Sequence, residues 1–238
     1  MAEWFADWFN EDYLALYPHR NEAEAARAVA LLTRTLPWTP GWRALDVGCG
    51  AGRHARALAA AGVRPVGLDL SAALLKVARG AGVPLVRADM RRLPVRDASV
   101  DLAVNLFTSF GYFEQDAEHA AVLRGVARCL RPGGWFALDF LNAEAVARGL
   151  VAAESQVLGG QEAAITRRID PREKRVIKTI RLADGRQFVE RVRLFGAGEL
   201  RAMLQDAGLR VRSAFGDYDG GSVGPDAPRT ILISQRAA

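Results

Sequence analysis

The stretch Leu45-Asp46-Val47-Gly48-Cys49-Gly50-Ala51-Gly52 decides the fold of this chain. An apolar run ends at the acidic residue Asp46 and Val47. Three glycines follow at alternate positions, and helix-forming residues begin at Arg53. Because glycine has no Cβ and tolerates unusual backbone angles, a ligand can lie directly against the backbone of such a loop. The N–H groups at the start of the following helix add a partial positive charge. The stretch therefore predicts a ligand-binding turn between a buried strand and a helix.

Asp46 indicates the charge of that ligand. A carboxylate at the end of the strand would repel a phosphate, whereas it suits a ligand with an ammonium or sulfonium group, and S-adenosylmethionine carries both. The same glycines also fit a dinucleotide fingerprint, Gly50-x-Gly52-x-x-Ala55, with alanine in the last place. A glycine loop can also simply make a tight turn between a strand and a helix. The rest of the chain decides among these interpretations.

The composition is that of a single globular domain. The chain has 238 residues, of which 50% are apolar and 25% are charged, which is ordinary for a soluble protein. No apolar run approaches the ~20 residues that span a bilayer, and the N-terminus lacks the basic segment of a secretory signal. Cys49 and Cys129 form no CxxC motif. We therefore expect a cytoplasmic protein. We expect it to have no disulfides, no metal site and no membrane partner.

The positive charge of the chain comes almost entirely from arginine. The formal net charge is +5 and the isoelectric point is about 9.7. The densest group of cations alternates with isoleucine and valine and consists of Arg167, Arg168, Arg172, Lys174, Arg175, Lys178 and Arg181. This alternation predicts the solvated face of a hairpin. Alternatively, these cations could form a surface patch that binds nucleic acid. We do not expect nucleic acid as a partner.

Strand-like and helical segments alternate through the middle of the chain. The expected strands are Ala44–Val47, Pro65–Leu68, Leu85–Val86, Val100–Asn105 and Trp135–Phe140, and the expected helices are Arg53–Ala61, Ala72–Arg79 and Asp116–Leu130. Such alternation predicts a doubly wound α/β fold with a parallel sheet and right-handed crossovers. Ligands bind beyond the carboxyl ends of the strands in such sheets, which is where the glycine loop falls.

Two segments fall outside this alternation. Residues 1–40 contain an aromatic-rich stretch and a helical pattern, and we expect an N-terminal helical cap over the core or over a ligand. From about residue 155 to 195 the apolar pattern changes to a period of two, with expected strands at 164–167, 175–180 and 188–194. This pattern predicts an antiparallel β-hairpin insertion within a domain of residues 41–238. The elements expected to close the chain are the helix Ala197–Ala207 and the strands Leu209–Phe215 and Thr230–Ser234.

Two further acids follow the next two strands. Asp69 ends the second expected strand, where a carboxylate accepts hydrogen bonds from both hydroxyls of a ribose in nucleoside-binding α/β folds. Asp89 follows the third strand, where it suits an adenine amino group, and Met90 suits the face of the ring. The alternatives are an N-cap role for Asp69, although Ser71 is the better cap, and an ion pair between Asp89 and a neighbouring arginine.

These residues together resemble the motifs of class I S-adenosylmethionine-dependent methyltransferases. The stretch from Leu45 to Gly52 is similar to the first motif of the family, Asp69 and Asp89-Met90 to later motifs, and Leu130-Arg131-Pro132-Gly133-Gly134 to the turn before the fifth strand. The resemblance is strong over residues 40–142. It implies a Rossmann-like, seven-stranded sheet with a reversed last strand, and S-adenosylmethionine as the cofactor.

The resemblance also implies a role for each motif residue. The backbone of the glycine loop would approach the methionine part of the cofactor, and Asp46 would lie near its ammonium group. Asp69 would bind the ribose, Asp89 the adenine, and the end of the fourth strand the methyl-donor end. The residues expected to bind the cofactor are Asp46, Gly48, Cys49, Gly50, Asp69, Leu70, Asp89, Met90, Asn105, Leu106, Phe107 and Arg20.

The segment Asn105-Leu106-Phe107-Thr108-Ser109-Phe110-Gly111-Tyr112-Phe113 indicates the acceptor class. It lacks the Asn/Asp-Pro-Pro-aromatic motif of enzymes that methylate base amines. It resembles the Phe-x-Ser-x-Gly-Tyr segment of small-molecule methyltransferases, including those that act on amino sugars and small amines. The segment from Tyr13 to Arg20 resembles a lid of the same relatives, in which Arg20 would hold the cofactor carboxylate by a bidentate pair. We therefore expect methyl transfer to nitrogen or oxygen of a small molecule.

Methyl transfer from an activated donor needs alignment more than acid–base chemistry. A general base is needed only for a nucleophile that arrives protonated, and His19 in the expected lid is the candidate for that base. Tyr17, Tyr112 and Phe107 are candidates for an aromatic wall that attracts a sulfonium or an amine, with core packing as the alternative. The candidate catalytic residues are therefore Tyr17, His19 and Tyr112.

Three other functions remain open from the sequence. A tRNA or rRNA methyltransferase would use the basic hairpin Arg167–Arg181 as a clamp on the nucleic-acid backbone. An NAD-dependent oxidoreductase is disfavoured by Asp46 before the glycines and by Asp89 after the third strand. A binding module without turnover would keep the same fold. The sequence leaves the acceptor, the acceptor atom and the oligomeric state open.

Overall fold

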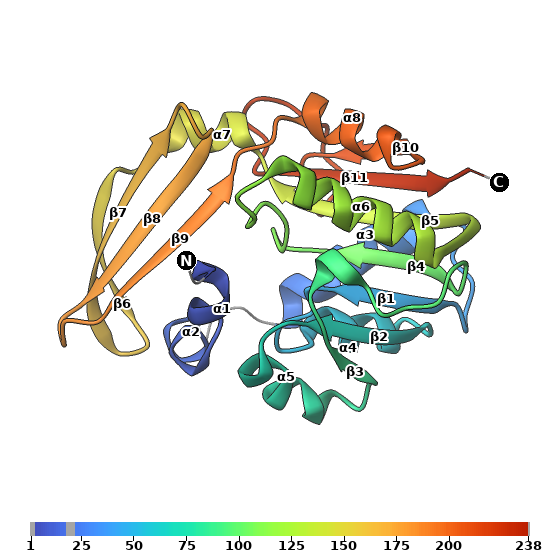
Figure 1. Ribbon diagram of the computed structural model, residues 1–238, viewed down its shortest axis with the longest axis horizontal. Coiled ribbons are helices and arrows are strands. Elements are labelled where there is room, and N and C mark those ends of the chain that lie inside the picture. The colour runs from blue at the N-terminus through green and yellow to red at the C-terminus, as the bar shows by residue number, and fades with distance from the viewer. Residues whose placement is uncertain (1–2, 18–21, 238) are drawn as a thin grey trace.

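Two β-sheets that stand side by side organise the chain (Figure 1). A computed structural model describes residues 3–17 and 22–237. The helices are α1 (Trp4–Trp8), α2 (Glu11–Leu16), α3 (Glu22–Thr35), α4 (Arg53–Ala60), α5 (Ala72–Ala78), α6 (Asp116–Cys129), α7 (Ala143–Gly149) and α8 (Ala197–Asp206), with short 3-10 helices η1 (Arg79–Ala81) and η2 (Met90–Arg92). The strands are β1 (Arg43–Val47), β2 (Arg64–Asp69), β3 (Leu85–Arg87), β4 (Val100–Asn105), β5 (Leu130–Leu141), β6 (Ala153–Leu158), β7 (Gln161–Asp170), β8 (Arg175–Leu182), β9 (Gln187–Arg193), β10 (Leu209–Phe215) and β11 (Arg229–Arg236).

The larger sheet is doubly wound. Its strand order is β10-β11-β5-β4-β1-β2-β3, and β1 pairs in parallel with β2 on one side and with β4 on the other. β11 runs antiparallel to both β5 and β10. The seven-stranded sheet with a reversed last strand that the sequence predicted is therefore confirmed. From β1 the chain continues to β2 on one side of the sheet, and from β4 it continues to β5 on the other. The strand order therefore reverses between β1 and β4, and ligands bind at the carboxyl ends of strands at such a switch point.

Helices cover both faces of this sheet. On one face α3 and α4 contribute Leu32 and Leu58 to an apolar core, and on the other α6 and α8 contribute Leu123 and Leu204. These four side chains are at most 1% exposed, and burying each one stabilises the fold by roughly 1.5–3 kcal/mol. In the ranges that the structure describes, no helix is long and apolar enough to cross a membrane.

The second sheet has one strand more than the predicted insertion. The antiparallel insertion that the sequence predicted from about residue 155 to 195 is confirmed as a sheet of order β6-β7-β8-β9 that begins at Ala153. The additional strand β6 lies at the edge, and most of its side chains are exposed or half-buried. It therefore lacks the alternation of apolar residues by which a half-buried strand is recognised. The short helix α7, which Asn142 caps, was also not predicted.

The helices α1 and α2 lie between the two sheets (Figure 1). Trp8 and Leu16 pack with Ile180 of the four-stranded sheet in a core of its own. Phe5 belongs instead to the core of the larger sheet. The N-terminal aromatic residues therefore pack in two directions and join the two sheets. The assignment of residues 1–40 as a separate cap stays a prediction.

Two buried arginines attach the four-stranded sheet to the larger one. Arg175 Nη2 donates to the backbone carbonyl of Glu114 at 2.8 Å, and Arg193 forms ion pairs with Asp116 and Glu199. Both arginine side chains are less than 10% exposed. The prediction that the cations around Arg175 form one solvated face is therefore wrong at this residue, because carbonyl groups replace the water around its guanidinium.

Gly111 lies where the loop after β4 meets β9. Its φ is +89°, and its carbonyl accepts a hydrogen bond from the backbone N–H of Arg193 at 2.8 Å. A Cβ at this position would lie 3.1 Å from side-chain atoms of Phe140 and Val192. Both the backbone angle and the available space therefore require glycine.

We expect Gly111→Ala to lower the free energy of unfolding by about 2–4 kcal/mol. The cost of the left-handed backbone angle and the cost of overpacking both contribute to this loss. Gly82→Ala is the matched control, since Gly82 also has a positive φ, +68°, but nothing lies within 4 Å of its Cβ position. The control should lose only about 1 kcal/mol. Denaturant unfolding of both variants measures the difference, and equal losses would contradict the packing argument.

Candidate active site

A cavity of about 500 Å³ opens at the carboxyl ends of β1, β2, β3 and β4. The glycine loop forms one wall, and α1, α2 and the loop after β4 contribute the others. We call it the loop cavity. The predicted cofactor residues that line it are Gly48, Cys49, Gly50, Asp69, Leu70, Asp89, Met90, Leu106 and Phe107. Segments that are far apart in the sequence thus meet around one space.

Asp69 ties the glycine loop to the end of β2. Its Oδ2 accepts from Gly50 N and its Oδ1 from Ser71 N, both at 2.8 Å. Burial raises the pKa of Asp69, and these backbone donors oppose that rise. The N-cap of α5 is Ser71, whose Oγ accepts from Leu74 N at 3.1 Å. Because a carboxylate has about four acceptor sites, Asp69 retains capacity for two further donors in the cavity.

Asp46 is buried two residues before Gly48 and lies behind the wall of the loop cavity. Burial, and after it the negative charge of Asp69, raises the pKa of Asp46 to about 7. Among the described residues, the buried side-chain polar atoms without a hydrogen-bond partner are Asp46 Oδ2, His54 Nε2, Asn105 Oδ1 and His119 Nδ1. The Ala55 backbone and the charge of Arg53 oppose this rise in pKa, but Oδ2 still has no donor. A cationic ligand nearby would favour the ionised form of Asp46 further.

Asp89 forms the ion pair that the sequence left as an alternative. Its carboxylate accepts from Arg91 Nε at 2.9 Å and from the Arg91 backbone N–H at 2.8 Å. Arg91 also contacts Glu3 and Glu118. Burial raises the pKa of Asp89, but the hydrogen bonds from Arg91 outweigh burial and hold this pKa below its usual range. Asp89 and Met90 nevertheless both line the cavity, so the ion pair positions Asp89 without removing it from the wall.

Asn105 and Ser109 connect the loop after β4 to the glycine loop. Asn105 is buried behind the wall, where its Nδ2 donates to the Val47 carbonyl at 2.9 Å. Ser109 Oγ donates to the Gly48 carbonyl at 3.2 Å. A Cβ on Gly48, whose φ is +74°, would lie 2.8 Å from the Cβ of Ser109. This close approach explains why glycine is required at position 48.

Phe107 and Thr108 form a strained turn in the wall of the cavity. Their φ angles are +57° and +63°, and the left-handed region costs roughly 1–2 kcal/mol for each residue with a Cβ. The backbone N–H of Phe107 donates to Asp139 Oδ2 at 2.8 Å, and that of Thr108 donates to the Asp139 carbonyl at 3.0 Å. Asp139 therefore satisfies both backbone donors of the turn.

Asp139 is itself fully buried and held from the other side. Arg229 Nε donates to its Oδ1 at 2.7 Å, and the Tyr218 hydroxyl donates to its Oδ2 at 2.6 Å. Arg229 also donates to Thr108 Oγ1 at 3.0 Å, and its guanidinium lies 5.3 Å from the centre of the Phe107 ring. The buried ion pair and the strained turn thus form one network.

A second cavity of about 440 Å³ lies between the loop after β4, α7 and the four-stranded sheet. We call it the sheet chamber. Within the described lining, the residues that it shares with the loop cavity are all aromatic: Phe9, Tyr13, Phe107 and Tyr112. We call these four residues the aromatic partition. The ring centres of Phe9 and Tyr112 lie 5.4 Å apart. Two ligands could therefore meet across aromatic rings.

The predicted catalytic residues divide among three places. Tyr112 belongs to the aromatic partition, and its hydroxyl donates to the Thr108 carbonyl at 2.5 Å. Tyr17 lines the loop cavity and forms a hydrogen bond with Lys178 of β8. Burial raises the pKa of Tyr17, which disfavours it as a base. His19 and Arg20 lie outside the described residues, so their roles stay predictions.

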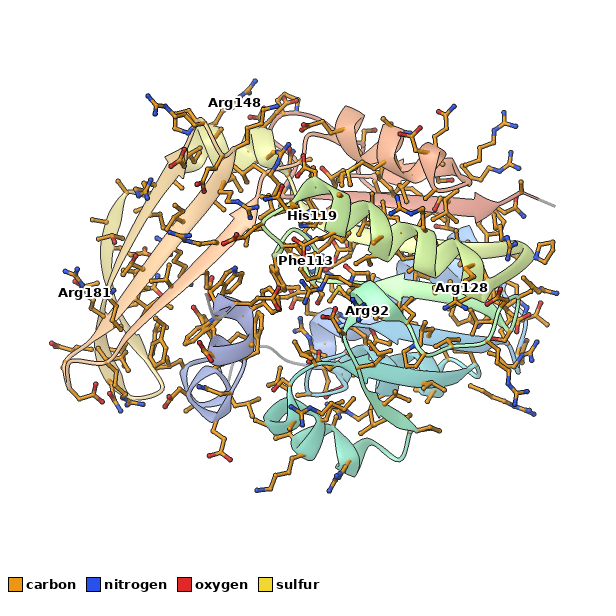
Figure 2. The ribbon with its side chains drawn as sticks, viewed as in Figure 1. Arg92, Phe113, His119, Arg128, Arg148 and Arg181 are labelled. Atoms are coloured by element: carbon orange, nitrogen blue, oxygen red, sulfur yellow. The ribbon has the colours of Figure 1, made fainter. Side chains whose placement is uncertain are left out.

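The two described histidines are buried and neutral. Burial lowers the pKa of His54 to about 3 and that of His119 to about 4. His119 Nε2 accepts from the backbone N–H of Phe113 at 3.2 Å, and Figure 2 shows these two residues close together beside α6. His119 therefore supports the loop after β4, and its place in the core makes it no candidate for a base.

Sequence reasoning missed several residues around the two cavities. Phe9 was expected only as part of a general cap, and Tyr13 only as the start of a lid. The Arg53 guanidinium lies 4.2 Å from the centre of the Phe107 ring. Its position directly after the glycine loop was the available signal. The charged residues of the sheet chamber are Glu154, Arg167, Lys178 and Glu190. They were not recognised because their meeting depends on the register of four strands.

We expect the affinity for S-adenosylhomocysteine to rise by about tenfold from pH 6 to pH 8, because Asp46 ionises with a pKa of about 7 and its ionised form attracts the ammonium group. Binding of this cation lowers the pKa and releases a proton. Calorimetric titrations at several pH values measure the effect. Asp46→Asn is the control and should show a flat profile. An equal slope in both proteins would contradict the assignment to Asp46.

Asp139→Asn should lower the free energy of unfolding by about 3–5 kcal/mol, because Arg229 is left as a buried charge without its partner. The double variant Asp139→Asn with Arg229→Gln removes both charges and should lose less than the single variant. Denaturant unfolding of the parent, the double variant and both single variants, Asp139→Asn and Arg229→Gln, measures the coupling. A double variant less stable than the single one would show that the ion pair does not organise the turn.

Comparison with known proteins agrees with this geometry. The chain matches the family described as "Methyltransferase domain" over residues 45–138. It is 35% identical over 105 residues to a ubiquinone biosynthesis O-methyltransferase of Bordetella bronchiseptica, a match that covers 43% of this chain and 44% of that protein. The chain thus matches less than half the length of this relative. The region matched by the family contains the glycine loop and Asp69.

Two further proteins match over nearly their whole length. Cypemycin N-terminal methyltransferase of a Streptomyces species is 32% identical over 217 residues, which is 82% of this chain and 84% of that protein. The structure of S-adenosylmethionine-bound CalS10, an amino pentose methyltransferase from Micromonospora echinaspora, is 26% identical with a TM-score of 0.67 and covers 95% of this chain and 97% of that chain. The chain therefore belongs to the family of S-adenosylmethionine-dependent methyltransferases.

Proposed function

We propose that the protein transfers a methyl group from S-adenosylmethionine in the loop cavity to the amine nitrogen of a small molecule in the sheet chamber. The observation that carries this proposal is the aromatic partition, across which the two cavities adjoin. Transfer needs the donor methyl and the nucleophile to meet in line in a space without water, and such alignment is worth roughly 7–11 kcal/mol. Two adjoining cavities of small-molecule size meet that requirement.

The residues of the loop cavity fit the donor. Asp69 has acceptor capacity for the two ribose hydroxyls, and Asp89 and Met90 line the same wall where the adenine would lie. Asp46, with its buried Oδ2 lacking a partner, suits the ammonium group. The donor supplies a methyl group on a positively charged sulfur: the nitrogen lone pair forms the new C–N bond as the S–CH₃ bond breaks, and the nitrogen proton leaves to solvent.

The surroundings of the aromatic partition favour nitrogen over oxygen as the acceptor atom. Phe9, Tyr13, Phe107 and Tyr112 include no carboxylate or imidazole, and these are the residues that both cavities share in the described lining. An alcohol needs a base to become nucleophilic, whereas an amine in its free-base form already has a lone pair. The proposal of His19 as a general base is retained for acceptors that arrive protonated.

Two of the relatives support an amine acceptor. The name of the cypemycin enzyme places methyl transfer at an N-terminus, and CalS10 is described as an amino pentose methyltransferase. The cypemycin enzyme matches 82% of this chain and CalS10 covers 95% of it. The O-methyltransferase of Bordetella matches only 43% of this chain. The relatives whose names refer to an N-terminus or an amino pentose therefore match more of this chain than the Bordetella enzyme does.

The basic hairpin offers little support for an RNA substrate. Of its cations, Arg175 is buried, and Arg167 and Lys178 line the sheet chamber. Of the remaining cations, Arg168 and Lys174 form ion pairs with Asp170 and Glu199. We therefore propose a small molecule as the partner, and the cytoplasmic location expected from the sequence stays a prediction.

Calorimetric titration and a radiolabelled methyl-transfer assay test the proposal together. We expect S-adenosylhomocysteine to bind at micromolar concentrations, NAD not to bind, and primary amines to accept label while matched alcohols do not. Asp69→Asn should weaken S-adenosylhomocysteine about 10- to 100-fold, because charge-assisted hydrogen bonds to the ribose are lost. Asp97→Asn is the control, since Asp97 is exposed and precedes β4 at the opposite edge of the sheet. NAD binding without S-adenosylhomocysteine binding would overturn the proposal.

A further inference from the structure

Four charged side chains form a row across the inner face of the four-stranded sheet. They are Glu154 on β6, Arg167 on β7, Lys178 on β8 and Glu190 on β9. Arg167 pairs in register with Lys178, and Lys178 with Glu190. Glu154 pairs with Ile165, two residues before Arg167, and so lies diagonally beside Arg167. The order of charges across the sheet is minus, plus, plus, minus.

This charged row is the ionic part of the sheet chamber. All four residues line it, and they are the charged residues of its described lining. Their side chains are 17% to 27% exposed. The neighbours on the same wall include Val176, and α7 and the segment after it contribute Val146 and Leu150. A ligand in the chamber would therefore meet apolar surface on most sides and the charged row on one.

The two cations face each other at the centre of the row. Each has a carboxylate on its far side: Arg167 Nη2 lies 2.5 Å from Glu154 Oε1, and Lys178 Nζ lies 3.7 Å from Glu190 Oε2. Like charges directly opposite on neighbouring strands destabilise a sheet. The alternating order, plus, minus, plus, minus, would contain the same residues and avoid this repulsion. The observed order places the most positive potential between Arg167 and Lys178.

Neighbouring groups hold both cations in place. The Val151 carbonyl and Glu154 accept from two nitrogens of Arg167, and an arginine has five N–H donors. Lys178 contacts the Tyr17 hydroxyl, and the Trp8 indole N–H donates to Glu190 Oε1 at 2.9 Å. The positions of the cations are thus fixed from α1, α2 and the sheet together. Preorganised donors of this kind bind an anion with little loss of side-chain entropy.

We propose that the methyl acceptor carries an anionic group, which binds between Arg167 and Lys178 while its amine lies at the aromatic partition. This inference rests on the proposed function and narrows its substrate class to amines with a carboxylate or a phosphate. Oxygens of either group accept charge-assisted hydrogen bonds from both cations. A neutral hydroxylated acceptor would also find partners in the row, but it would gain nothing from two adjacent cations.

The first test compares matched ligands in protein saturated with S-adenosylhomocysteine. The probes are straight-chain ω-amino carboxylates of increasing length, the amino alcohols of equal length, and the corresponding aminoalkyl phosphates. Calorimetry should show the best anionic probe binding at least about tenfold more tightly than its alcohol. The carboxylate and phosphate arms identify which anion the row prefers. Equal affinities for anions and alcohols at every length would overturn the proposal.

The second test changes the order of charges without changing their number. The double variant Glu154→Arg with Arg167→Glu keeps an ion pair but makes the row plus, minus, plus, minus. We expect the preference for the anion to fall to within about twofold, because the cations are separated. The free energy of unfolding should not decrease, since the like-charge contact is removed. A preference that survives the exchange would contradict a binding role for the central cations.

A single substitution with a matched control separates this effect from net charge. Arg167→Gln should lose most of the anion preference. Arg181→Gln removes the same charge from β8 and should retain it, because Arg181 is exposed on the outer side of the sheet, as Figure 2 shows. S-adenosylhomocysteine affinity is measured for every variant. If the parent fails to bind it, the proposed function fails, and the anion comparison in the unloaded protein still decides the charge of the ligand.

Discussion

The buried carboxylate of Asp139 is the interaction on which the site depends. It joins the turn at Phe107, the loop that carries Tyr218 and the strand β11 that carries Arg229. Because Phe107 lines both cavities, this one carboxylate sets the position of the wall between them. The left-handed angles at Phe107 and Thr108 persist because an ion pair and hydrogen bonds over-determine the turn. Strain is therefore stored at the place where the two ligands would meet.

The N-terminal helices give the two cavities a common boundary. Trp8 packs on the four-stranded sheet and bonds to Glu190, while Phe9 and Tyr13 belong to the aromatic partition. Tyr17 lines the loop cavity and contacts Lys178, which lines the sheet chamber. Ligands in the two cavities would thus contact the same residues. Where this contact couples the two binding events, thermodynamics makes the coupling reciprocal.

The sequence predicted the parts of the site that are local. The turn from Leu45 to Gly52 and the acids that follow β2 and β3 could be recognised because strand, glycine and acid are adjacent in the chain. Burial of Arg175 could not be predicted, since its partners are backbone carbonyls far away in sequence. The charged row needed the register of four strands, and the edge strand with Glu154 lacks an apolar alternation. Residues 18–21, with the predicted base and carboxylate ligand, lie outside the described ranges.

The distribution of charge around the loop cavity is consistent with catalysis of methyl transfer. Positive charge disappears from sulfur as the methyl group leaves, so a carboxylate beside the sulfur would stabilise the bound donor more than the transition state and slow the reaction. Asp69 and Asp89 follow β2 and β3, where the ribose and adenine would lie. The proposed methyl-donor end is instead bordered by Phe107 and Tyr112, whose rings attract a cation less strongly than a carboxylate does. On the proposed assignment, Asp69 and Asp89 would lie where the charge of the ligand does not change during transfer.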